Sequence, residues 1–98
     1  RLREVLQPLD HAEHDREGHR FHACVDGHDA VVDYRLADRV MTIIHTGVPP
    51  AIEGRGIAAA LTRAAMEAAK ADGWKVHPRC EYAAAWLRRH KEYADLVV

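Results

Sequence analysis

A short glycine turn holds the residues whose types and spacing best suit binding chemistry. Glu53-Gly54-Arg55-Gly56 lies between a strand-like stretch and an alanine-rich helical stretch. The first N–H groups of a helix have no intrahelical partner, and the helix dipole makes that end partly positive. Glycines ahead of it let a ligand approach the backbone closely, so the turn predicts a cradle for a phosphate or diphosphate. The alternative is a tight turn that needs glycine only for positive φ, and the turn alone favours neither.

Two common phosphate-binding loops do not fit this turn. A Walker loop has Lys and then Ser or Thr directly after its last glycine, where this chain has Ile57-Ala58. Gly54-x-Gly56-x-x-Ala59 satisfies a loose dinucleotide-binding pattern. That pattern starts directly after a strand, however, and here the residues from Pro49 onward intervene. The chain is also too short for the paired βαβ halves of a Rossmann fold, which we therefore do not expect.

Alternating side chains predict three antiparallel strands ahead of the turn. The strands cover residues 20–25, 30–36 and 40–48. Asp26-Gly27 is the signal of a tight hairpin between the first two. Pro49-Pro50 ends the third strand because proline donates no backbone hydrogen bond. The polar residues 1–18 show no sustained period and are expected to form an irregular lead-in.

After the turn the period changes to that of a helix. Gly73 follows this helix at the position of a left-handed C-cap. Residues 74–77 predict a short strand, parallel to 40–48 because a helical crossover joins the two. Residues 81–90 predict a second helix, and the tail 91–98 a final short strand. The expected inward residues are Ile57, Leu61, Ala64 or Ala65, and Ala68 in the first helix, and Tyr82, Ala83, Trp86 and Leu87 in the second.

This order of elements defines the fold class. An antiparallel meander followed by strand, turn, helix, strand and helix around a central mixed sheet is an α+β (mixed α/β) fold. With 98 residues, 48% of them hydrophobic, we expect one small domain over 1–98. Much of that fraction is alanine and only 6% of the residues are aromatic, so the core should be thin. The sequence does not decide whether a homodimer completes this thin core.

Charge and cysteine usage limit the classes of partner. Fourteen basic and fifteen acidic residues nearly cancel, which points neither to nucleic acid nor to an anionic membrane surface. No apolar run approaches the length of a spanning helix, and the first residues lack the apolar centre of a signal peptide. Cys24 and Cys80 are far apart and form no CxxC pair, so a reducing, cytoplasmic compartment is the expectation.

Eight histidines are many for a chain of this length. His11-x-x-His14 and His19-x-x-His22 have spacings that occur among metal ligands. Zinc sites normally add cysteine pairs or an HExxH helix, and this sequence has neither. We therefore expect no bound metal, with these histidines solvated.

Four short motifs together resemble one family. They are His45-Thr46-Gly47-Val48-Pro49-Pro50, Gly54-Arg55-Gly56-Ile57, Pro78-Arg79-Cys80 and Arg88-Arg89-His90-Lys91-Glu92-Tyr93. With the order of elements above, they resemble the GNAT N-acetyltransferase superfamily, and in particular its small members of minimal length. The resemblance covers roughly residues 20–98. The combination is much more specific than the paired glycines alone.

The resemblance implies that acetyl-CoA binds in a V-shaped opening between the two central strands. Backbone N–H groups of the glycine turn would bind the diphosphate of coenzyme A, and the strand edge near Val48 would pair with the pantetheine arm. Arg55 would reach a phosphate or else lie solvated. Ala51 stands where the superfamily's signature has a polar residue, which removes one side chain and leaves the backbone cradle intact. The residues implied for coenzyme A are Val48, Glu53, Gly54, Arg55, Gly56, Ile57 and Ala58.

Acetyl transfer to an amine needs a base for the amine, donors for the carbonyl oxygen and an acid for the leaving thiolate. Relatives often have a glutamate where this chain has Gly47. They also often have a tyrosine on the later helix, and the place where we would expect it holds Trp86. Three candidates remain. Cys80 would act as nucleophile or acid at the start of a helix, His45 as base on the strand face of Gly47, and Tyr93 as a further member.

Each of these three side chains also has a purely structural interpretation. Cys80 would then be an inert core residue, His45 a histidine hydrogen-bonded within the sheet, and Tyr93 a packing residue under the tail. We predict an acetyl-CoA-dependent N-acetyltransferase that acts on a small amine or an exposed lysine. The alternative is a module that binds acetyl-CoA or coenzyme A with little or no turnover.

Overall fold

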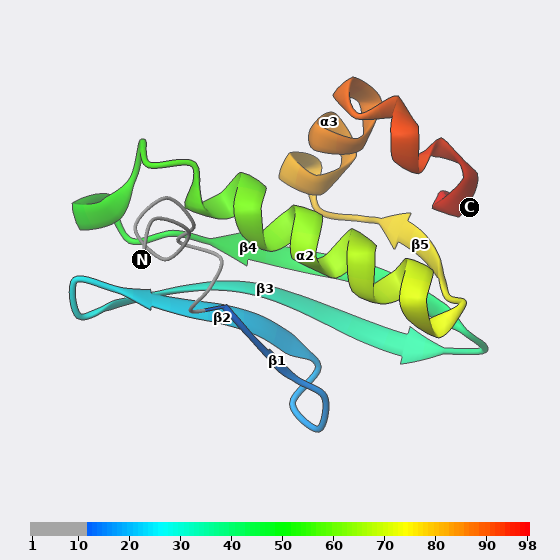
Figure 1. Cartoon of the computed structure of the whole chain (residues 1–98), viewed down its shortest axis with the longest axis horizontal. Helices are drawn as coiled ribbons and strands as arrows, with labels where there is room; N and C mark the ends of the chain where they lie inside the picture. Colours follow the sequence, from blue (N-terminus) through cyan, green and yellow to red (C-terminus); the bar gives the residue numbers. More distant parts are fainter. Residues whose placement is uncertain (1–11) are drawn as a thin grey trace, which may run out of the picture.

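Five strands and two α-helices make up the fold in the computed structural model, which describes residues 12–98 (Figure 1). The elements in chain order are β1 (Glu13–Asp15), β2 (Arg20–Val25), β3 (His28–Ala37), β4 (Val40–Gly47), the 3-10 helix η2 (Pro50–Ile52), α2 (Ile57–Asp72), β5 (Lys75–Pro78), α3 (Glu81–Arg89) and the 3-10 helix η3 (Lys91–Leu96). The strands form one sheet in the order β1-β2-β3-β4-β5. Only β4 and β5 pair in parallel, so the predicted mixed sheet and α+β class are confirmed.

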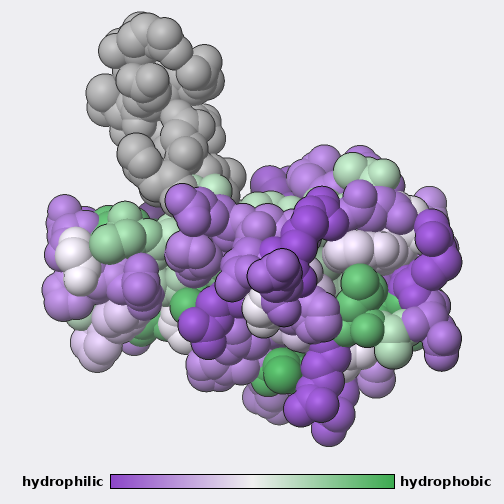
Figure 2. Space-filling model, turned by 90° about the horizontal axis from the view of Figure 1, so that it is seen from below, coloured by the Kyte–Doolittle hydropathy of each residue, from purple (hydrophilic) through white to green (hydrophobic). Residues whose placement is uncertain are grey.

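Both helices lie on the same side of the sheet, and the core fills the space between them and the strands (Figure 1). Phe21, Val32 and Ile43 point into this core from the strands, and Leu61 and Met66 from α2. Every second side chain of a strand points toward the helices, which explains why these strand residues are buried. The opposite face of the sheet is largely hydrophilic (Figure 2). The molecule is therefore a two-layer structure with its core on one side of the sheet.

Helix α2 begins and ends at the residues that the sequence predicts. Gly73 at its C-terminus has φ +73°, and its N–H donates to the carbonyls of Ala69 and Lys70. Ile57, Leu61 and Ala65 are buried as predicted, Ala65 being one of two alternatives, but the next buried alanine is Ala69 rather than Ala68. The whole buried set is Ile57, Leu61, Thr62, Ala65, Met66 and Ala69. Small alanines on this face let the helix lie close to the sheet.

The expectation of an irregular lead-in is wrong for residues 13–15, and residues 1–11 lie outside the described part of the chain. Strand β1 pairs antiparallel with β2 at the edge of the sheet. His14 Nε2 lies 2.6 Å from Tyr34 Oη, and the His14 ring stacks on Phe21 with centroids 4.0 Å apart. A three-residue polar edge strand carries no apolar period, which is why the sequence did not indicate it.

The tail was expected to form a strand and instead forms η3. Its hydrogen bonds run from the Tyr93 N–H to the His90 carbonyl and from the Val97 N–H to the Ala94 carbonyl. The Tyr93 side chain is 2% exposed, so the tail is held by a buried aromatic ring rather than by a strand ladder. An isolated parallel bridge between Val76 and Val97, and a hydrogen bond of 2.9 Å from Lys75 Nζ to the Asp95 carbonyl, join the tail to β5.

Candidate active site

Strands β4 and β5 diverge halfway along β4. Their last paired residues are Ile43 and Pro78. Beyond that point the N–H groups of Arg79 and Cys80 both donate to the Ile43 carbonyl, each over 3.0 Å, and the chain turns into α3. Strand β4 continues to Gly47, and no strand among residues 12–98 pairs with that part of its β5 side. This divergence forms a V-shaped opening between β4 and the edge strand β5.

A cavity of about 540 Å³ lies at this opening. It runs from the free end of β4 to the first turn of α2, and one residue of α3 also lines it. The lining residues are Thr46, Gly47, Val48, Ile52, Glu53, Gly54, Gly56, Ile57, Ala58, Ala59 and Tyr82. All the residues that the resemblance implied for coenzyme A therefore line one cavity, with the exception of Arg55.

The glycine turn has the geometry of an anion cradle. Gly54 and Gly56 have φ values of +81° and +76°, which glycine adopts readily and other residues rarely do. Within residues 12–98 the N–H groups of 54–59 donate no backbone hydrogen bond, and the first that does is that of Ala60, to the Gly56 carbonyl over 3.0 Å. A Cβ atom on either glycine would meet nothing within 4 Å. The turn thus presents unused donors to open space at the positive end of α2.

Arg55 points away from this cavity. Its Nη1 atom lies 2.6 Å from Oδ2 of Asp26, at the tip of the β2–β3 hairpin. The ion pair is exposed, so its contribution to stability is small. Arg55 therefore links the glycine turn to a neighbouring hairpin, and the backbone rather than this side chain forms the cradle.

Cys80 lies beside the cavity, at the residue just before α3. Its half-buried thiol donates to Thr46 Oγ1 over 3.4 Å, and Thr46 lines the cavity. Burial alone would raise the pKa of the Cys80 thiol, but the Thr46 hydroxyl and nearby backbone N–H groups outweigh it, and the pKa is lowered. The contributing backbone N–H groups are those of Ala83 and Tyr82, in the first turn of α3, and of Thr46.

The lowered pKa gives a testable pH dependence. In a Cys24→Ala background, alkylation of Cys80 by iodoacetamide should reach half its maximal rate at a lower pH than alkylation of an ordinary exposed cysteine does. The direction follows because a lowered pKa yields the reactive thiolate at lower pH. Thr46→Val removes the hydroxyl at nearly constant volume and should move the midpoint upward. A midpoint that is unchanged in Thr46→Val would show that Thr46 does not tune this thiol.

His45 does not meet Cys80, because the two lie on opposite faces of the sheet. Thr46 pairs with the buried Val32 and faces the helices, whereas His45 pairs with Asp33 and faces the open side. Gly47 is on the His45 face, and a Cβ built there would lie 2.9 Å from His45 Nε2. The imidazole therefore fills the space that a side chain at position 47 would enter. The prediction that His45 shares a face with Gly47 is confirmed.

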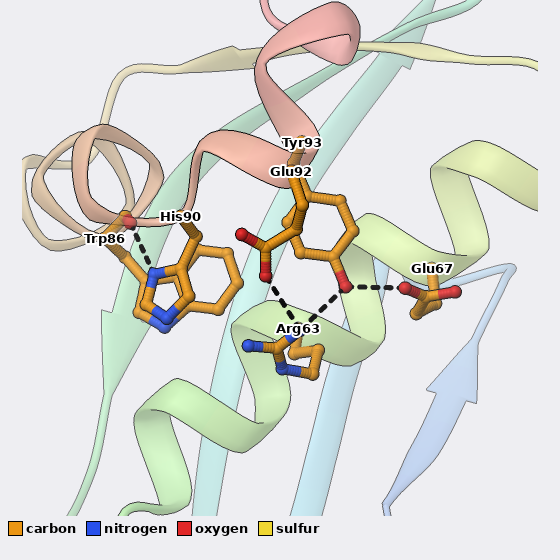
Figure 3. A network of polar contacts seen from close by, with 6 residues as sticks. All are labelled: Arg63, Glu67, Trp86, His90, Glu92 and Tyr93. Atoms are coloured by element: carbon orange, nitrogen blue, oxygen red, sulfur yellow. Dashed lines mark hydrogen bonds and ion pairs between the residues drawn. The ribbon is translucent and has the colours of Figure 1, made fainter.

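Tyr93 lies outside the cavity, within a polar network between α2 and η3 (Figure 3). Its hydroxyl donates to Glu67 Oε2 over 2.5 Å and accepts from Arg63 Nη1 over 3.0 Å. Arg63 Nη1 also contacts Glu92 Oε2 at 3.3 Å. Burial, together with the bond to Glu67, raises the pKa of Tyr93 and keeps the phenol protonated. This arrangement suits a residue that holds η3 on α2.

Tyr93→Phe should therefore act mainly on stability. Loss of the hydroxyl removes its bonds to Glu67 and Arg63, and we expect the free energy of unfolding to fall by about 1 kcal/mol. Urea denaturation followed by circular dichroism measures this change. A large loss of acetyl transfer at unchanged stability would instead return Tyr93 to the catalytic group.

Tyr82 lines the cavity, whereas the sequence pattern predicts it only as an inward side chain of the second helix. Burial raises its pKa, and the nearby Arg89 opposes that effect. Its hydroxyl is thus a proton donor at neutral pH. The sequence feature that pointed to a place for Tyr82 in the site is its position in the first turn of the helix, two residues after Cys80. This turn lies at the end of the sheet where the glycine turn also lies.

Other expected features can be placed within residues 12–98. No group of three or more His, Cys, Asp or Glu side chains there is arranged to hold a metal ion. His14 instead bonds to Tyr34, and His22 Nε2 lies 3.4 Å from Glu13 Oε1. Cys24 and Cys80 are both free thiols. In this part of the chain no helix has the length and apolar character needed to cross a membrane.

The sheet order, the divergence of β4 and β5 and the glycine cradle at the start of α2 define a small GNAT-type protein. Residues 20–96 match the family described as GCN5-related N-acetyl-transferase. The chain therefore belongs to the GCN5-related N-acetyltransferase family, and the family expected from the sequence motifs is confirmed.

Similar proteins agree with this assignment. Protein NATD1 of Mus musculus and of Homo sapiens are each 36% identical over 81 residues, which cover 80% of this chain and 74% and 72% of theirs. Protein NATD1 of Danio rerio is 32% identical over 91 residues, or 88% of this chain and 83% of its own. A GCN5-like protein from Staphylococcus aureus, solved by NMR in solution, has a TM-score of 0.70 at 25% identity and covers 89% of this chain and 86% of that one.

Proposed function

We propose that this chain is an N-acetyltransferase that takes its acetyl group from acetyl-CoA and transfers it to a small amine or an exposed lysine. The observation that carries the proposal is one cavity that joins the N–H cradle of α2 to the free end of β4, with the Cys80–Thr46 pair beside it. Acetyl-CoA supplies an acetyl group activated as a thioester. The open space at both cradle glycines and the unused N–H donors fit its diphosphate.

The chain would bind and orient the coenzyme with its backbone. N–H groups of Gly54 to Ala59 take the diphosphate, because the helix dipole and the missing Cβ atoms favour an anion there. The unpaired side of β4 near Val48 pairs with the amide groups of the pantetheine arm, as an added strand would. This orientation directs the thioester toward Thr46 and Cys80.

Cys80 would handle the leaving sulfur in one of two ways. As an acid, its thiol gives its proton to the coenzyme sulfur when the carbon–sulfur bond breaks, and regains a proton from the amine. As a nucleophile, its thiolate takes the acetyl group and releases the coenzyme thiolate, and the amine then takes the acetyl group from Cys80. Tyr82, on the same cavity wall, is a second proton donor.

The amine would approach from the open face of the sheet. His45 faces that side at the stretch of β4 that lacks a partner strand, so it is the base nearest to this approach. The coenzyme then binds on the face that the helices cover and the acceptor amine on the open face, and the opening between β4 and β5 connects the two.

A binding module without efficient turnover is the second candidate. It is favoured by the lining of the cavity, where Glu53 on the cradle turn is the one carboxylate and Gly47 offers no side chain. Gly47→Glu separates the two candidates. A chain that binds the coenzyme with little turnover should gain turnover at unchanged coenzyme affinity, whereas an enzyme that already uses His45 should gain nothing, because the new side chain displaces the imidazole.

The direct test is a titration with acetyl-CoA, followed by an assay of thiol release with a panel of amines. At a coenzyme concentration about 100 times the Kd, we expect the melting temperature to rise by about 10 °C or more. Thiol release that depends on the amine identifies an enzyme. Binding without release would leave the binding module, and no thermal shift at any dose would refute both.

A further inference from the structure

A bulge in β4 places two consecutive side chains on the open face of the sheet. Tyr34 of β3 pairs with Ile43 of β4. Asp33, the residue before Tyr34, pairs with His45, so Ile44 is an extra residue without a partner on β3. Ile44 and His45 are both exposed, whereas strict alternation would turn one of them toward the helices. The candidate base therefore has an apolar side chain directly beside it, on the face from which the amine would approach.

A cavity of about 280 Å³ lies at this bulge. Its lining residues are Arg35 of β3, Ile44 of β4 and Arg79, which directly follows β5. All three are exposed, and Arg35 alternates with the buried Tyr34. The cavity is thus on the sheet face opposite the helices, which is largely hydrophilic (Figure 2). It is separate from the cavity at the glycine turn, with which it shares no residue.

The lining residues of this cavity are sequence neighbours of two candidate catalytic residues. Ile44 precedes His45 on β4, and Arg79 precedes Cys80. The N–H groups of Arg79 and Cys80 both donate to the Ile43 carbonyl, which fixes Arg79 where β4 and β5 separate. Consecutive Cα atoms are about 3.8 Å apart. One small molecule can therefore span the distance from this cavity to the opening between the strands.

The cavity carries positive charge that no residue from 12 to 98 neutralises. Arg35 and Arg79 form no ion pair with any of these residues. Asp33, which pairs with His45, is already bound to Arg20, whose Nε lies 2.5 Å from its Oδ1. Neither β4 nor β5 contains an acidic residue. The open face beside the opening therefore favours an anion.

We propose that this cavity binds a carboxylate of the acceptor, and that the acceptor is a small amine of the amino-acid class. Arg35 and Arg79 hold the carboxylate between them, because a planar guanidinium group matches the two carboxylate oxygens with paired hydrogen bonds. Ile44 contacts the carbon atoms that join the carboxylate to the amine. The proposal rests on the proposed function, in which the amine approaches His45 from this face, and it narrows the acceptor to one chemical class.

The test compares amino acids with their carboxamides as acceptors, since the two differ in the charge of one group. The pairs are glycine, β-alanine and γ-aminobutyrate, each with its amide, and thiol release from acetyl-CoA gives kcat/KM. The wild-type chain should prefer at least one acid over its amide by about tenfold or more, as expected for charge-assisted hydrogen bonds. Arg35→Gln and Arg79→Gln should each lose most of this preference. Arg88→Gln is the matched control, since Arg88 is an exposed arginine on α3 outside this cavity.

The kinetic outcomes separate this proposal from the proposed function. Thiol release at equal kcat/KM for every acid and its amide overturns the carboxylate site and leaves the acetyltransferase intact. A preference that survives in either Arg35→Gln or Arg79→Gln, or that Arg88→Gln loses equally, also overturns the site. Because all three arginines are exposed, circular dichroism should show that each variant remains folded.

Absence of thiol release with every amine would count against the proposed catalysis alone. The cavity is then tested by an amide NMR titration of the ¹⁵N-labelled chain with the same acids and amides. Shifts at residues 35, 44 and 79 with an acid but not with its amide support the carboxylate site. Equal shifts with both, shifts confined to other residues, or none overturn it.

Discussion

Replacing Cys80 by alanine is expected to lower the rate of acetyl transfer by about 100-fold or more, with coenzyme affinity nearly unchanged. The size follows from the usual contribution of a positioned acid or nucleophile. The thiol is half-buried beside Thr46 at the divergence of β4 and β5, and its pKa is lowered despite burial, so it is set for proton or acetyl transfer. Steady-state kinetics and calorimetry on the same preparations separate kcat from binding.

Two controls make this result specific. Cys24→Ala removes the other thiol, which is exposed on β2, and should leave the rate unchanged. Mass spectrometry of the wild-type chain with acetyl-CoA and no amine distinguishes the two roles of Cys80. An acetyl group on Cys80 identifies the nucleophile, and its absence the acid. Full activity in Cys80→Ala would show that this cysteine contributes only to packing.

Gly56→Val is expected to weaken coenzyme A binding by about 10- to 100-fold, the loss of one or two charge-assisted hydrogen bonds. Gly56 has φ +76°, which a β-branched residue rarely adopts, and the new side chain would project into the open space where the diphosphate lies. Gly54→Val should behave in the same way, since its φ is +81°.

Gly27→Val is the matched control for the backbone strain. Gly27 has φ +77° and, like Gly56, open space at its Cβ position, but it lies in the β2–β3 hairpin. Both variants should lose similar stability, and only the cradle variant should lose the coenzyme. Equal affinities of Gly56→Val and Gly27→Val would refute the cradle.

Side-chain patterns predicted most of the fold because the buried elements carry a clear period. Strands β2 to β4 alternate, α2 repeats with the period of a helix, and Gly73 ends it as expected. The failures occur where the pattern is short or polar. Strand β1 is held by its edge pairing and by His14, and η3 by the buried Tyr93, and neither leaves a periodic signal.

The candidate site divides in a similar way. The cradle was predictable because it depends on local chemistry, namely two glycines just before a helix. The Cys80–Thr46 contact joins residues 34 positions apart, and only the pairing of β4 with β5 brings them together. The separation of His45 from Cys80 also depends on tertiary structure, because the strand face that the helices cover cannot be identified from His45 alone.

The proposed function depends most on diphosphate binding by the N–H groups at the start of α2. A titration of the ¹⁵N-labelled chain with coenzyme A, followed by amide NMR shifts, tests this binding directly. We expect the largest shifts on residues 54–59, with smaller ones along the free end of β4. Amide shifts confined to other parts of the chain, or none at saturating coenzyme, would contradict it.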